Sequence, residues 1–107
     1  MTTEQIESKA QELSVKLNTK VTPLVFIDGD SKEQVIGYLK ELPRDVKLRI
    51  MDSMLTGAYS AVGSVIDYYL IQEESDKRIL IEDNFYMGAV QELFNMVKLS
   101  TNQFKKK

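Results

Sequence analysis

Residues 21–42, VTPLVFIDGDSKEQVIGYLKEL, decide the fold of this chain. The stretch opens with a short apolar run rich in β-branched side chains, which is typical of a strand. Asp28-Gly29 follows at once, and this dipeptide is a strong signal for a hairpin turn. The return segment, residues 34–42, is ambiguous because its apolar residues fit either the two-residue period of a strand or the spacing of a helix. The preceding turn and Gly37 favour a β-hairpin over residues 21–41.

A proline adds a constraint to the first of these strands. Since Pro23 has no N–H to donate to a sheet ladder, it belongs on an edge strand or at the start of a strand. We therefore expect residues 21–27 to lie at the edge of the sheet.

The segment before the hairpin is predicted to be an amphipathic helix within residues 1–19. Thr2 and Gln5 have the spacing of a capping box. Apolar residues then recur at intervals of four, three and four, at Ile6, Ala10, Leu13 and Leu17. Because this stripe is thin, the helix can cover only a small area, whether it is loosely attached to the chain or paired with another copy.

Helices are predicted downstream of the hairpin over residues of about 44–55, 58–71 and 83–104. Pro43 ends the hairpin, and Asp83 is suited to cap the last helix. A polar stretch, residues 72–78, interrupts the apolar pattern. The middle helix has a face of small residues that lets two backbones approach closely, which predicts that it is the central helix; these are Gly57, Ser60, Ala61 and Ser64.

The predicted fold is therefore α+β and mostly helical, with an N-terminal helix, a short hairpin and about three packed helices. With 107 residues, 43% of them hydrophobic and 28% charged, the chain is too short for two typical domains. We expect residues 20–107 to form a single compact domain.

Composition excludes several kinds of chemistry. The chain contains no cysteine, histidine or tryptophan, so it has no thiolate nucleophile, imidazole base or Cys/His metal site. A net charge of −2 gives no electrostatic footprint for nucleic acid. No apolar run approaches the length of a membrane span, and the N-terminus does not resemble a signal peptide. We expect a cytoplasmic protein with no membrane or nucleic-acid partner.

Two acidic segments raise the question of a metal site. Asp28-Gly-Asp30 begins like a calcium loop, but Lys32, Glu33 and Leu39 stand where that loop needs other residues. A second group could hold Mg²⁺ or act as paired carboxylates, and it comprises Glu73, Glu74, Asp76, Glu82 and Asp83. A solvated loop followed by a helix N-terminus, where carboxylates favour the dipole, is the preferred interpretation. A metal-dependent enzyme is thus only an alternative, and we expect no enzyme activity, cofactor or metal.

The order of these segments resembles the tail assembly chaperones of long-tailed, siphovirus-type bacteriophages over residues of about 20–107. The resemblance lies in the hairpin that ends in Pro43-Arg44, in the helices that follow, and in the sequences EDNFYMGA at 82–89 and NQFKKK at 102–107. It implies a non-enzymatic helper that binds the tape measure protein and keeps this long, helical, aggregation-prone chain soluble until the tail tube polymerises.

Candidate partner-binding residues lie in the last helix and at the chain end: Phe85, Met87, Phe94, Phe104, Lys105, Lys106 and Lys107. The aromatic residues and methionines also fit a helical core, and the lysines also suit a helix C-terminus. The resemblance further implies a contact with the tail tube protein, a location in the host cytoplasm and absence from the mature virion. Self-association stays open, and a small acidic regulatory module that binds a host protein is the alternative function.

Overall fold

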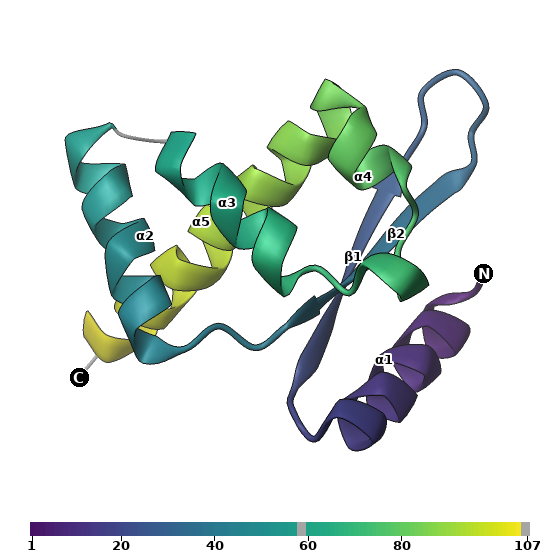
Figure 1. The fold of residues 1–107 in the computed structure, drawn as a ribbon, viewed down its shortest axis with the longest axis horizontal. Helices are drawn as coiled ribbons and strands as arrows, with labels where there is room; N and C mark the ends of the chain where they lie inside the picture. Colours follow the sequence, from purple (N-terminus) through teal and green to yellow (C-terminus); the bar gives the residue numbers. More distant parts are fainter. Residues whose placement is uncertain (58–59, 106–107) are drawn as a thin grey trace.

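We describe a computed structural model of the chain, which covers the backbone of residues 1–57 and 60–105 and the side chains of residues 1–57 and 62–97. The elements are, in order, α1 (Thr3–Leu17), β1 (Val21–Ile27), β2 (Gln34–Lys40), α2 (Arg44–Thr56), α3 (Ser60–Tyr69), the 3₁₀ helix η1 (Gln72–Glu74), α4 (Arg78–Ile81) and α5 (Asp83–Lys105). The predicted α+β layout of N-terminal helix, hairpin and packed helices is confirmed. Figure 1 shows the hairpin running between α1 on one side and α3, α4 and α5 on the other.

The hairpin separates two apolar cores. Its strands pair antiparallel from Val21 opposite Lys40 to Ile27 opposite Gln34, so alternate side chains point to opposite faces. One face carries Leu24, Val35 and Leu39 into the core that the later helices share. The return segment is thus a strand, and both of its faces are covered.

The larger core joins one hairpin face to α2, α3, α4 and α5. Its members recur at helical spacing in the long helices, where residues three and four apart share a face. They are Leu24, Val35, Leu39, Leu42, Val46, Ile50, Val62, Val65, Ile66, Leu70, Ile79, Phe85, Ala89, Leu93 and Val97.

The smaller core lies between α1 and the other hairpin face. Both bonds of the predicted capping box are present, between Thr2 and Gln5. The helix packs on the hairpin of its own chain through its apolar stripe. The buried part of this stripe ends at Leu13, one turn before the predicted end at Leu17, which is exposed. The buried residues of this core are Ile6, Ala10, Leu13, Val21, Tyr38 and Ile71, with Ile36 packed beside them.

The hairpin loop is longer than an Asp-Gly turn requires. The strands stay paired as far as Asp28 and Glu33, where the Asp28 N–H donates to the Glu33 carbonyl at 2.9 Å. The Asp28 carboxylate accepts from the N–H groups of Asp30 and Ser31. The left-handed residue is Lys32, with φ 63°, and not Gly29. The predicted turn between the strands is thus present, and the Asp28 side chain organises it as a four-residue loop.

The outer side of β2 is covered by the chain between α3 and α4. Leu70 forms an isolated bridge with Leu39, and the Ile71 N–H donates to the Tyr38 carbonyl at 2.8 Å. The Tyr38 N–H in turn donates to Ser75 Oγ at 3.0 Å. Since the sheet has two strands, β1 is an edge strand, as Pro23 predicted.

The later helices differ from expectation in three respects. The polar stretch contains η1, and α4 follows it. Asp83 is the first residue of α5 and not the cap before it. The central helix is α5, which packs against α2, α3, α4 and β1. The close approach of α3 to α5 is at Gly63, where Tyr86 donates a hydrogen bond to the carbonyl at 2.7 Å. Residues 58–59 of the predicted middle helix lie outside the described residues.

Replacement of Gly37 by alanine should lower the free energy of unfolding by about 1–3 kcal/mol, because it overpacks a filled core. An added Cβ would lie 2.5 Å from Ile79 Cδ1 and 3.2 Å from Leu70 Cδ1, and both side chains are buried. The control is Gly29→Ala, since no atom lies within 4 Å of a Cβ there. Urea unfolding measures both variants, and equal stability would contradict the close contact at Gly37.

Candidate binding surface

The sequence-predicted contact residues do not form one surface. Phe85 is buried, and its ring centroid lies 6.1 Å from that of Phe26. Phe94 is partly buried against the larger core. Met87 is 69% exposed and points outward. Phe104, Lys105, Lys106 and Lys107 lie outside the residues whose side chains are described.

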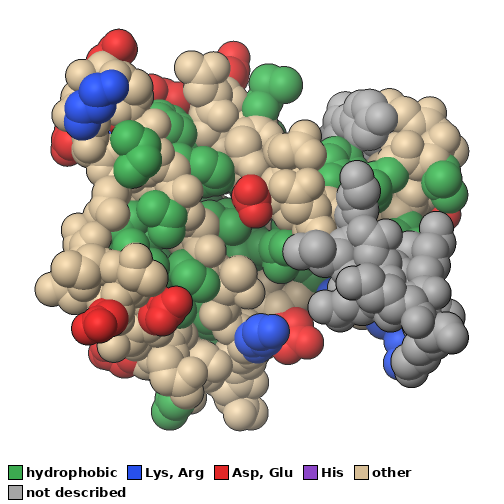
Figure 2. All heavy atoms as spheres, turned by 180° about the vertical axis from the view of Figure 1, so that it is seen from behind, with side chains coloured by type: hydrophobic (Ala, Val, Ile, Leu, Met, Phe, Trp, Pro, Cys, Tyr) green, Lys and Arg blue, Asp and Glu red, His purple; other side chains and the backbone are tan. Residues whose placement is uncertain are grey.

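Exposed apolar side chains instead come from several elements. Figure 2 shows hydrophobic side chains gathered on the hairpin side of the rear face. Scattered exposed apolar residues are normal on protein surfaces, whereas gathered ones mark contact sites. Among residues 1–57 and 62–97, the large exposed apolar residues are Met1, Val15, Leu17, Val25, Ile27, Leu48, Leu55, Tyr68, Ile81 and Met87.

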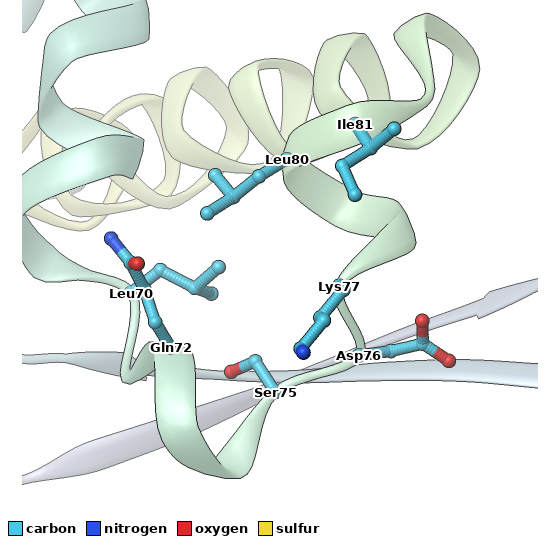
Figure 3. A pocket seen from close by; sticks show the side chains of 7 residues that line it. All are labelled: Leu70, Gln72, Ser75, Asp76, Lys77, Leu80 and Ile81. Atoms are coloured by element: carbon cyan, nitrogen blue, oxygen red, sulfur yellow. The ribbon is translucent and has the colours of Figure 1, made fainter.

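A small apolar depression lies between the end of α3, η1 and α4. Its volume is about 190 Å³, which is below the range of pockets for drug-sized ligands and suits one or two apolar side chains. Figure 3 shows how the lining residues converge, with the Asp76 carboxylate turned away from the others. The lining residues are Leu70, Gln72, Ser75, Asp76, Lys77, Leu80 and Ile81.

Three polar groups around this depression are already engaged within the protein. Ser75 Oγ accepts a hydrogen bond from the Tyr38 N–H at 3.0 Å. Gln72 Nε2 donates to the Asp67 carbonyl at 3.1 Å. The Asp76 carboxylate binds Arg78. A ligand would therefore meet mainly apolar carbon, above all at Ile81, which is 74% exposed. The exposed Lys77 is a further polar residue that lines the depression (Figure 3).

Arg78 holds the segment that frames the depression against the hairpin. Its Nε and Nη2 atoms donate to the two carboxylate oxygens of Asp76 at 3.1 and 2.8 Å, and Nη1 lies 3.5 Å from Asp28 Oδ2. These hydrogen bonds lower the pKa of Asp76, against an opposing contribution from burial. The pKa of Asp28 is also lowered, first by the backbone N–H groups of Asp30 and Ser31. The guanidinium thus ties the 76–78 turn to the hairpin loop.

The acidic segment of the sequence disperses in the fold. Glu74 pairs with Lys9 of α1 at 3.4 Å, and Asp76 pairs with Arg78. The carboxylates of Glu73, Glu82 and Asp83 belong to exposed residues. Within the described residues, no group of three or more acidic side chains is placed to hold a metal ion. None of the helices, as far as the chain is described, combines the length and apolar character needed to cross a membrane.

Comparison with known proteins adds no relative: no family model matches the chain, and no curated protein or solved structure is significantly similar to it. The depression is a feature that sequence reasoning missed. Its one signal was the return of apolar residues at Ile79-Leu80-Ile81 after the polar stretch. In one turn of helix these three side chains point in different directions, so Ile79 is buried and Ile81 is exposed.

Two residues of α5 provide a test of which predicted contact residues are structural. Phe85→Ala should lower the free energy of unfolding by about 3–5 kcal/mol, because it removes a buried ring. Met87→Ala should change it by less than about 0.5 kcal/mol, because the side chain is exposed. Denaturant unfolding measures both variants. If Phe85→Ala leaves the free energy of unfolding unchanged, Phe85 is a candidate contact residue and not a core residue.

The Asp76–Arg78 pair predicts a pH dependence of stability. Because the folded-state pKa of Asp76 lies below its usual value of 3.8, its contribution is complete well above pH 4 and is lost as the pH falls through the lowered folded-state pKa. Asp76→Asn should therefore be less stable than the unmodified chain at pH 7, and the difference should shrink below about pH 4. Thermal unfolding across this range measures the difference, with Glu12→Gln on the exposed side of α1 as the control. A difference independent of pH would contradict the role of the charged pair.

Proposed function

We propose that this chain is a non-enzymatic tail assembly chaperone of a long-tailed bacteriophage. It binds the tape measure protein in the cytoplasm of the bacterial host and keeps it soluble until tail tube subunits polymerise around it. The observation that carries the proposal is the apolar depression beside Ile81, whose Gln72, Ser75 and Asp76 side chains are engaged within the protein. Such a site is suited to take up apolar side chains.

The size of the depression fits a client that is long and repetitive. A volume of about 190 Å³ accepts one or two side chains, so each contact is weak. An amphipathic helix presents an apolar side chain on almost every turn, and many copies of a small chaperone along it would supply the total affinity. Contact with the tail tube protein and release before the virion is complete belong to the same proposal.

The arrangement of elements gives further support. The resemblance implies a hairpin, a Pro-Arg step and packed helices over residues of about 20–107, and the chain has this layout. A regulatory module that binds a host protein through the acidic segment is less well supported, since Glu74 and Asp76 pair with cations of the same chain.

Co-expression with the long helical protein encoded beside this chain tests the proposal. The unmodified chain should raise the soluble fraction of that client severalfold, and Ile81→Asp should remove most of the effect because it places a charge at the apolar depression. Val15→Asp is a matched control, because Val15 and Ile81 are both 74% exposed and Val15 lies on α1. A client that is equally soluble with and without this chain would refute the proposal.

A further inference from the structure

The second hairpin face is occupied by α1, whose contacts define what this face binds. Three side chains of the helix are buried there: Ile6, Ala10 and Leu13. They meet Val21 and Tyr38 of the hairpin, and Ile71 beyond β2, in the smaller core. The face therefore accepts an amphipathic helix with a narrow apolar stripe and a small residue at its middle.

The polar contacts that hold α1 in place are weak. Lys9 pairs with Glu74 at 3.4 Å, and more than a quarter of each side chain is exposed. The N-terminal ammonium of Met1 donates to Gln34 Oε1 at 2.6 Å at an exposed site. The exposed Lys9–Glu74 ion pair adds little stability, since water competes for both partners. Attachment of α1 thus depends on three buried side chains.

Tyr38 makes the docking of α1 on the hairpin less favourable than the apolar contacts between them indicate. Its side chain is only 2% exposed, yet its hydroxyl finds no hydrogen-bond partner in the described part of the chain. Lys9 Nζ lies 5.6 Å from the ring centroid, which places α1 beside the ring. Burial raises the pKa of this hydroxyl, as expected for a group withdrawn from solvent. Departure of α1 would let the hydroxyl bond to solvent.

The same hairpin face continues beyond the area that α1 covers. Val25 lies opposite Ile36, and Ile27 lies opposite Gln34, so these side chains share the face of Tyr38. They are 45% and 58% exposed. This face therefore carries an exposed apolar area that α1 does not cover.

We propose that this hairpin face is a binding surface for a helix of another protein, and that α1 is an internal occupant which the incoming helix displaces. The inference rests on the helical client of the proposed function. The partner that fits is an amphipathic helix with aliphatic, small and aliphatic residues at positions i, i+4 and i+7, as at Ile6, Ala10 and Leu13. A lysine at i+3, the place of Lys9, would reach Glu74.

A fluorescently labelled peptide of residues 1–18 is the probe for this surface in the full-length chain. Ile6→Asp/Leu13→Asp, which should detach α1, is expected to bind the peptide about tenfold more tightly than the unmodified chain, because apparent affinity follows the fraction of chains with an open surface. Leu13→Ala should act in the same direction if the double variant fails to fold. Val15→Asp should bind like the unmodified chain, and a peptide with aspartate at positions 6 and 13 should not bind.

Tyr38→Phe provides a variant with the opposite expectation. It keeps the ring and removes the hydroxyl, so α1 should dock more firmly, hydrogen exchange of the α1 amides should slow, and peptide binding should weaken. Equal peptide binding by the unmodified and the detached chains would overturn the inference. A second result would also overturn it: no form of the chain binds the peptide, and the unmodified chain sediments as a dimer that Leu13→Ala converts to a monomer. In that case α1 would be exchanged between two copies of the chain. If the detached chain does not bind the peptide while the unmodified chain still keeps the client soluble, this inference is overturned and the proposed function stands.

Discussion

The alternation of side chains along the β-hairpin is the constraint on which the structure depends. Because successive residues point to opposite faces, Leu39 enters the larger core and its neighbour Tyr38 enters the smaller one. A shift of one residue in the register would exchange the two sets and leave both cores unfilled. The hairpin is stable as a two-stranded unit because helices cover both of its faces.

Much of the fold could be predicted from the sequence because its signals are local. The β-branched run, the prolines and the helical periodicities marked the hairpin and the long helices near their observed bounds. Tertiary context decided the rest: the Asp28 carboxylate captured two backbone N–H groups and enlarged the loop. Contact between Gly63 and Tyr86 belongs to a pairing of α3 and α5, and Gly63 was not among the small residues from which the central helix was predicted.

The candidate surface was less predictable for a related reason. Periodicity says which residues share a face, but it does not say which face turns inward when an element has several neighbours. Phe85 and Met87 are two residues apart on α5 and have opposite environments. The depression beside Ile81 combines Leu70, which follows α3, with residues of η1, of α4 and of the loop between them, and no local pattern brings these together. Docking of α1 likewise depends on residues far away in the sequence, because its thin apolar stripe packs against Tyr38 and Ile71.

Both edges of the hairpin are protected against pairing with other strands. Tyr38 directs its backbone groups away from β1, where they bond to Ile71 and Ser75. Its partner across the sheet is Pro23, so the open edge of β1 has a residue without an N–H at this point. A chain with this edge resists joining a growing cross-β stack. A strand that approached this edge would lose one ladder hydrogen bond at Pro23, which works against edge-to-edge association of two copies of the chain.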